Sequence, residues 1–529
     1  MSSTHLDAVT PDGAQPLTLT DRMPAAWKLS GATTGMVAVL GAVFFFTSWL
    51  PLSHTDVFGH LSYGRLIWQS KAIPATEPFM PLAEGMPLID TAWLTQLVQF
   101  GLYSQWDYSA LRFLQALCVT GCFALLARRL FQRTGSPGFV MLGMATFALV
   151  AWVQLSIVRP QTVAMLCYMA LLALLTVPKW KTWHWFALPA VMALWANIHG
   201  SFLVGGLVLT SMVVGRVIDV CRRSGCHALL KDRPLRRLAL MWELGIAATC
   251  FNPYGVWLYA EVLPFSQNMN LDALPEWAAL QFRSGLGQAS AVMALGLCVA
   301  YRWSPRRVTS AEVLCLVSLG ALALWSQRML IWWAPVASLC LVTHLHAAWR
   351  VRHARVALPE GHTIWTFLSL LLVWVFFALT PFGMRVVNGT RDKRPLNAAT
   401  PVLAVNWLKA NPPKGQVFNV MEWGDYLVWA GPPGVKVFAT SHTHLIPADV
   451  WRHYMQVIEQ KGDWQLTLDK YGVNTVLLDK YEREALVDSL RDADDKWTPA
   501  YEDGMSIVFE RNMPKAGEAK APATPAAAH

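Results

Sequence analysis

The chain has 529 residues, of which 54% are hydrophobic and only 15% are charged, and its mean hydropathy is +0.34. A soluble domain carries roughly 25% charged residues, so this composition excludes a single large soluble core and favours membrane spans. The net charge of +9 does not indicate a nucleic-acid partner, because the basic residues fall in short loops between apolar runs.

Apolar runs of about 16 to 22 residues recur along the chain and predict a polytopic α-helical membrane protein with roughly eleven spans. The polar N-terminal stretch lacks the apolar core of a signal peptide, so the first run is expected to remain as an uncleaved span. The predicted spans are residues 33–52, 109–131, 137–157, 160–177, 183–199, 201–219, 238–254, 287–303, 309–326, 329–346 and 363–382.

The distribution of Lys and Arg predicts the orientation. If the N-terminus is cytoplasmic, every predicted inner loop is basic, whereas the short outer turns hold only isolated basic residues such as Arg159 and Arg328. The positive-inside rule then places the N-terminus in the cytoplasm, and an odd number of spans places the C-terminus outside.

Two long segments are therefore predicted on the outer side. The first is expected to contain helices near 57–70 and 91–106, and the second contains strand patterns at 415–420, 435–440 and 474–479 among helical stretches. The predicted organisation is a disordered cytoplasmic N-terminus (1–32), a transmembrane domain (33–383) with the outer loop 53–108, a soluble outer α/β domain (384–512) and a disordered tail (513–529).

Polar side chains at span ends and in outer loops collect on this outer side. Ionisable groups at membrane depth usually face a cavity or a partner, so many spans delivering such groups to one side predict a shared outer cavity. The residues concerned are Asp56, His60, Arg65, Glu77, Asp90, Arg159, Gln161, Asn197, His199, Asn252, Tyr254, Glu276 and Arg328.

Asp56 lies directly after the first predicted span and four residues before His60, so the two share one helix face. A carboxylate there could take a proton from an acceptor hydroxyl or bind a metal, and the alternative is that it caps a helix. Glu77 and Asp90 are further carboxylates of the same loop, each of which could equally be a cap.

The guanidinium groups of Arg159 and Arg328 suit bidentate binding of a phosphate, although an Arg in an outer turn often reaches to lipid headgroups instead. Asn197 and His199 could hydrogen-bond a sugar or satisfy a free helix end. The spacing of His442 and His444 could suit a metal, but two His alone are interpreted as loop residues.

The chain resembles the GT-C superfamily of membrane glycosyltransferases, which use polyprenyl-phosphate-linked sugars and place an acidic residue just after the first span. The resemblance implies that Asp56 is the catalytic acidic residue, which acts as a base on the acceptor or positions it. It also implies that Glu77 is the second acidic residue of the loop and that Arg159 and Arg328 hold the donor phosphate. The phrases that carry it include DVFGHLSYGRLI (56–67), IPATEPFMP (73–81), VRPQTVAML (158–166), LWANIHGSFLVG (194–205) and WGDYLVW (423–429).

The chain departs from some members of that superfamily because Val57 and Phe58, and not a second acid, follow Asp56. No cofactor is therefore assigned, and a divalent metal at Asp56 stays open. Further contacts with the substrate are predicted for the outer polar residues His60, Arg65, Asp90, Gln161, Asn197 and His199.

The sequence thus predicts a glycosyltransferase of a bacterial inner membrane, with its C-terminal domain in the periplasm. It would transfer a sugar from a polyprenyl-phosphate donor to an outer-facing lipid-linked glycan, polysaccharide or protein. Two alternatives stay open: a non-catalytic assembly or scaffold protein, and a transporter or flippase of a lipid-linked solute.

Overall fold

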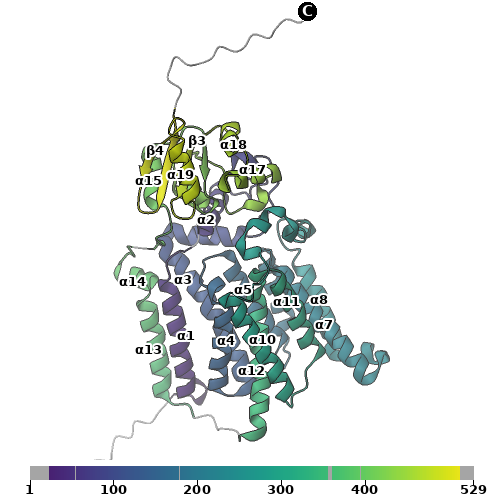
Figure 1. Cartoon of the computed structure of the whole chain (residues 1–529). Coiled ribbons are helices and arrows are strands. Elements are labelled where there is room, and N and C mark those ends of the chain that lie inside the picture. Colours follow the sequence, from purple (N-terminus) through teal and green to yellow (C-terminus); the bar gives the residue numbers. More distant parts are fainter. Residues whose placement is uncertain (1–22, 54, 178, 355–359, 394, 513–529) are drawn as a thin grey trace, which may run out of the picture.

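The structure is a computed structural model, and it describes residues 23–53, 55–177, 179–354, 360–393 and 395–512. Residues 1–22 of the predicted cytoplasmic segment and the predicted disordered tail 513–529 lie outside these ranges. Figure 1 shows a bundle of long helices with a sheet and its flanking helices at one end of the bundle.

A helix lies in each of the eleven ranges predicted as spans. By length and composition, five of the described helices could cross a membrane, or six if the bent pair α13 and α14 (Pro381–Asn388) is one span. That the shorter helices also cross stays a prediction. The helices are α1 (Gly31–Trp49), α3 (Trp93–Thr134), α4 (Pro137–Leu155), α5 (Pro160–Leu175), α6 (His184–Ala196), α7 (Phe202–Ser224), α8 (Arg233–Ala248), α10 (Gly285–Trp303), α11 (Ser310–Trp325), α12 (Leu330–Arg352) and α13 (Thr363–Ala378).

Local sequence signals set the ends of several helices. Helices α4 and α5 begin on Pro137 and Pro160, because proline fits the first helical turn, where its missing N–H is not needed. Helix α3 ends before Gly135, whose φ of +62° is a conformation that glycine adopts without strain. Thr309 and Glu312 form a capping box at the start of α11.

Helix α2 (Asp56–Ser70) packs along the first part of α3, at the end of the bundle nearest the sheet. The two backbones approach closely, since a Cβ at Gly64 would lie 2.2 Å from the carbonyl oxygen of Gln96. The sequence predicted separate helices over 91–106 and 109–131, and the structure joins them in α3 through a bend. Trp106 and Asp107 have non-helical backbone angles at that bend.

The C-terminal unit contains a five-stranded sheet in the order β2-β1-β3-β5-β4. β1 pairs in parallel with β2 and β3, whereas β5 pairs antiparallel with β3 and β4. The sequence analysis missed α16, β4 and β5. The elements are α15 (Val402–Ala410), β1 (Gln416–Asn419), α16 (Met421–Ala430), β2 (Lys436–Val437), α17 (Ala448–Ile458), α18 (Trp464–Lys470), β3 (Val473–Asp479), α19 (Glu484–Asp492), β4 (Trp497–Glu502) and β5 (Ser506–Arg511).

The C-terminal unit shares one hydrophobic core with the segment 53–108, which contains α2. Val57, Phe58 and Leu61 of α2 are buried in the same apolar cluster as the strands of the sheet. The ring of Phe58 lies against that of Tyr426 in α16, with centroids 4.7 Å apart. Burial of aromatic side chains is a large favourable term, so the contact fixes the C-terminal unit on α2.

This packing predicts that Gly59→Ala in α2 destabilises the protein. A Cβ at Gly59 would lie 2.5 Å from Oδ1 of Asp425 in α16, so the buried Asp425 side chain or the helix that carries it must shift. Overpacking of this kind costs about 1–3 kcal/mol, which we expect as a lower melting temperature in detergent. The control is Gly35→Ala in α1, where the added Cβ meets nothing within 4 Å. Equal melting temperatures for the two variants would contradict the tight packing of α16 on α2.

Candidate active site

Four charged side chains form a continuous series of ion pairs at the end of the bundle that carries α2. An oxygen of Asp56 lies 2.8 Å from one guanidinium nitrogen of Arg159, and another nitrogen of Arg159 lies 2.8 Å from Glu276. The other carboxylate oxygen of Glu276 accepts a hydrogen bond of 2.5 Å from Arg328. Two guanidinium groups and two carboxylates therefore meet in one place, and their formal charges balance.

Three of these four side chains lie where helices begin. Asp56 is the first residue of α2, Arg159 is the N-cap of α5, and Arg328 lies in the short turn directly before α12. Arg159 is extended, with φ −140° and ψ 156°, as the residue before a proline prefers. Helix N-termini carry partial positive charge and free N–H groups, so their convergence favours an anion at this place.

Glu276 is held by a turn that is tied to the start of α12. It lies in the 3-10 turn Pro275–Trp277. The backbone N–H of Gln327, next to Arg328, donates to the carbonyl of Ala278 at 3.0 Å. Burial raises the pKa of the Glu276 carboxyl, but Arg328 and Arg159 outweigh burial, so this pKa lies below its usual value. Glu276 is therefore an anion that neutralises both guanidinium groups.

His60 lies one helical turn after Asp56 and within electrostatic reach of both arginines. Burial lowers its pKa to about 3, helped by His442 and the arginines and opposed by Asp56. The imidazole is thus neutral at physiological pH and can both donate and accept a hydrogen bond.

His199, between α6 and α7, is a second imidazole beside the same charges. It lies within electrostatic reach of Arg328, His60 and Arg159. Its Nδ1 lies 2.8 Å from the hydroxyl of Ser201. The structure therefore brings Asp56, His60, Arg159, His199 and Arg328 together, although they lie far apart in the sequence.

Glu77 lies in the outer loop but is engaged by the loop itself. The hydroxyl of Tyr63 donates a short hydrogen bond to one carboxylate oxygen. The other oxygen accepts from the backbone N–H groups of Phe79 and Met80, at 2.8 and 3.2 Å. These contacts fix the loop against α2.

Asp90 and Asn197 also make structural contacts. Oδ1 of Asp90 accepts from the N–H of Ala92 and from the amide of Gln96, at 2.9 and 3.0 Å. Asn197 donates to two backbone carbonyls and accepts from the indole of Trp93 at 3.1 Å. They hold together the segments that carry His60 and His199.

Arg65 and Gln161, which were also singled out in the sequence, lie in different surroundings. The guanidinium of Arg65 lies over the ring of Trp429, 4.5 Å from its centroid, and so contacts the C-terminal unit. Gln161 is buried in the first turn of α5, two residues after Arg159.

The sequence analysis missed the roles of two residues. Glu276 was identified only as an outer polar residue, yet it joins the two arginines. His442 was interpreted as a loop residue, yet its ring lies 5.9 Å from that of His60. The only sequence signal for Glu276 was its position between Pro275 and Trp277 on the outer side.

The side chains that the structure describes around Asp56 do not form a metal site. No group of three or more His, Cys, Asp or Glu side chains in the described part of the chain could hold a metal ion. Asp56 and Glu276 both face guanidinium groups at hydrogen-bond distance, which is a poor setting for a cation. We therefore derive no step through a metal.

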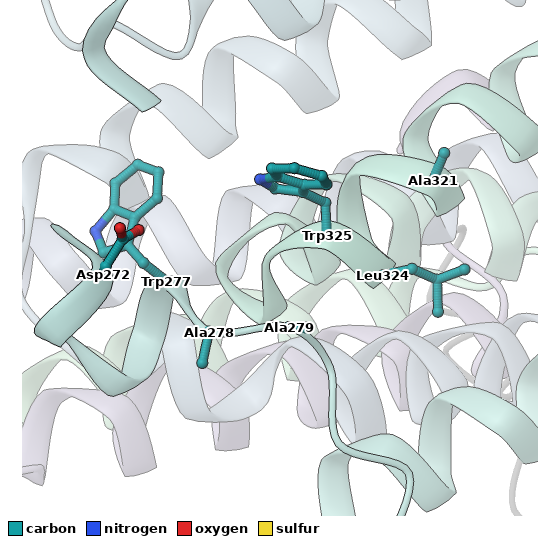
Figure 2. A pocket seen from close by; sticks show the side chains of 7 residues that line it. All are labelled: Asp272, Trp277, Ala278, Ala279, Ala321, Leu324 and Trp325. Atoms are coloured by element: carbon teal, nitrogen blue, oxygen red, sulfur yellow. The ribbon is translucent and has the colours of Figure 1, made fainter. Parts of the chain in front are cut away.

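An open pocket of about 620 Å³ lies next to the ion pairs. Figure 2 shows the indole of Trp325 between Trp277 and the side chains of Ala321 and Leu324. The guanidinium of Arg328 lies over the ring of Trp277, 5.1 Å from its centroid, so a residue of the pocket wall contacts the charged cluster.

Comparison with known proteins was made on both sequence and structure. No family model matches the sequence, and no curated protein matches it. Several solved structures match over most of the chain. ArnT from Cupriavidus metallidurans, bound to undecaprenyl phosphate, is 13% identical, with a TM-score of 0.50 over 90% of this chain and 98% of ArnT.

Two further matches are with proteins that are longer than this chain. The oligosaccharyltransferase of Archaeoglobus fulgidus is 11% identical, with a TM-score of 0.52 over 85% of this chain and 70% of that protein. The arabinofuranosyltransferase AftD from Mycobacteria is 14% identical, with a TM-score of 0.53 over 92% of this chain and 40% of AftD. All three are GT-C superfamily glycosyltransferases, so the chain has the GT-C fold and the predicted resemblance is confirmed.

The environment of Asp90 predicts a pH dependence of stability. Burial raises the pKa of this carboxyl to about 7, although Ala92 and Gln96 donate to it. Because the folded pKa lies above the unfolded value of about 4, the free energy of unfolding falls as the pH rises from about 4 to about 7.

Asp90→Asn removes this effect and keeps both hydrogen bonds, since both go to the oxygen that Asn retains. We expect the variant to be more stable than the wild type at pH 8, by up to about 4 kcal/mol, and equally stable near pH 4. Thermal unfolding in detergent measures the difference, with Glu84→Gln at an exposed position of the same loop as the control. A difference that does not change with pH would contradict the burial of a neutral Asp90.

Proposed function

We propose that the protein is a membrane glycosyltransferase that moves a sugar from a polyprenyl-phosphate donor to a hydroxyl-bearing acceptor on the outer side. The observation that carries this proposal is the series of ion pairs Asp56–Arg159–Glu276–Arg328 at the start of three helices. The GT-C fold supports it, and ArnT, which shares that fold, was solved with undecaprenyl phosphate bound.

The reaction breaks the bond between the sugar C1 and the phosphate oxygen, and the bonding electrons leave with the phosphate. The acceptor oxygen forms the new bond to C1, and its proton passes to the carboxylate of Asp56. The leaving polyprenyl phosphate gains one negative charge. Arg159 and Arg328 would stabilise this charge, because a guanidinium group binds phosphate oxygens in a bidentate manner.

In this proposal, the carboxylate of Glu276 occupies the position that the donor phosphate takes when the donor binds. Its two carboxylate oxygens bind one guanidinium group each, as two phosphate oxygens would. An anionic phosphate that enters the cluster displaces this carboxylate from at least one of the two arginines. Until the phosphate binds, Glu276 keeps both arginines ordered. Without Glu276, two positive charges would stand close together in a largely buried site.

The pocket beside Trp277 would receive the first isoprene units of the donor. Its lining is mainly apolar, and the exposed indole of Trp325 forms one side. Trp277 links it to Arg328, so a lipid in the pocket would present its phosphate to the cluster.

The membrane arrangement belongs to the same proposal. We infer about eleven spans, a cytoplasmic N-terminus and an outer C-terminal unit in a bacterial inner membrane. The charged cluster would then lie at the outer membrane surface. There it can meet both a membrane-bound donor and an outer-facing glycan or protein acceptor.

Asp56→Asn tests the chemical role of the carboxylate. In membranes supplied with a panel of radiolabelled polyprenyl-phosphate sugars, the wild type should transfer label and the variant should lose about 100-fold or more of the rate. The control is Asp232→Asn, which changes another carboxylate paired with an arginine, Arg216, at 2.6 Å. Transfer by Asp56→Asn at the wild-type rate would rule out this base, and no transfer by the wild type from any donor would count against the enzyme.

Ala321→Trp tests the lipid pocket by filling it. We expect the KM for a long-chain donor to rise about tenfold, because the apolar contact of several isoprene units is lost, while a short-chain donor is affected little. Val292→Trp, at an exposed position of α10 that does not line the pocket, is the control. An equal change for long and short donors would show that the pocket does not hold the lipid.

A further inference from the structure

A loop of the C-terminal unit, Thr440–Ile446, reaches over α2 beside the charged cluster. The ring of His442 in this loop lies 4.8 Å from the ring of Tyr63 and 5.9 Å from that of His60, between centroids. The loop therefore brings an imidazole from the C-terminal unit to the same face of α2 that carries Asp56.

This loop is fixed from two directions. On one side, the amide of Asn270 donates to the carbonyls of Thr443 and Ile446 at 2.7 and 2.8 Å, and that of Asn268 donates to His444 at 3.0 Å. These bonds come from the segment that precedes Glu276 in the chain.

On the other side, a carboxylate oxygen of Asp425 accepts from the backbone N–H of Ser441 at 3.2 Å. Asp425 is buried against Gly59 of α2, where an added Cβ would lie 2.5 Å from Oδ1 of Asp425. The position of His442 is thus set by both the helical bundle and α16.

Buried polar atoms without a hydrogen-bond partner gather around His60 in the described part of the chain. Nδ1 of His442, Oδ2 of Asp90 and Oε1 of Gln96 are all of this kind. The amide nitrogen of Gln96 lies 3.4 Å from His60 and 3.0 Å from Asp90, which connects them. A buried polar atom without a partner costs about 1–3 kcal/mol, so such a group of atoms points to a polar ligand.

The side chains around His60 are neutral, whereas the four side chains of the ion pairs are charged. Burial lowers the pKa of both His442 and His60, and it raises the pKa of Asp90 to about 7. Neutral imidazole, amide and carboxylic acid groups both donate and accept hydrogen bonds, which suits hydroxyl groups. The guanidinium groups of the cluster suit a phosphate instead.

We propose that His442 is an acceptor-binding residue, whose imidazole hydrogen-bonds a hydroxyl group of the acceptor sugar next to His60. This inference rests on the proposed glycosyltransferase function and assigns the acceptor side of its site to the C-terminal unit. The donor phosphate then lies at the arginines, and the reacting hydroxyl lies between the two halves, close to Asp56.

The test compares His442→Ala and His442→Gln with the wild type in full-length protein. The acceptor source is a titrated detergent extract of membranes that lack the protein. We expect His442→Ala to raise the apparent acceptor KM about tenfold, with kcat within threefold and the donor KM unchanged. Gln, which also donates and accepts, should restore part of the affinity. The control is His453→Ala in the same unit, whose ring bonds Tyr471.

An unchanged acceptor KM in His442→Ala, with an active wild type, overturns the inference but leaves the proposed function intact. A rise in the donor KM instead would assign His442 to the donor. Equal losses in the Ala and Gln variants together with lower melting temperatures would show a structural role only. A wild type that transfers nothing is a failure of the proposed function itself, and the inference falls with it.

Discussion

The site depends on the neutralisation of two guanidinium groups that are held together in a largely buried place. Neither Arg159 nor Arg328 could stay there alone, because an uncompensated charge away from water costs several kcal/mol. Asp56 and Glu276 supply the compensation, and each comes from a different segment. The same attraction thus stabilises the protein and assembles the groups that the proposed phosphate-linked donor would require.

The second constraint is the shared core between the C-terminal unit and α2. The helix that carries Asp56 and His60 is held between α3 on one side and α16 on the other, with glycine at each close approach. Asp56 therefore sits on a rigid element, and the loop that carries His442 is fixed to the same element. Packing, and not a flexible connection, therefore positions both the Asp56 carboxylate and the loop beside it.

The sequence was sufficient to predict the helices of the bundle, which depend on local patterns. It was insufficient to predict contacts between side chains that lie far apart in the chain. Apolar periodicity located the bundle helices. The distribution of Lys and Arg predicted that Asp56, Arg159 and Arg328 lie on the same side of the membrane, and the structure brings these three residues together. The sequence could not show that Glu276 would join both arginines, or that Glu77 would be engaged by Tyr63, because such contacts depend on how distant segments pack. Strands β4 and β5 and helix α16 were missed because short amphipathic segments give weak patterns.

The central claim is that the arginine cluster is the phosphate site of a lipid-linked donor. The most direct measurement is an experimental structure of the full chain, in lipid nanodiscs, with a polyprenyl phosphate bound. The account predicts that the phosphate lies against the guanidinium groups of both Arg159 and Arg328, with Glu276 moved away from at least one of them and the lipid chain in the pocket beside Trp277. A phosphate bound elsewhere, with the four ion-paired side chains unchanged, would contradict it.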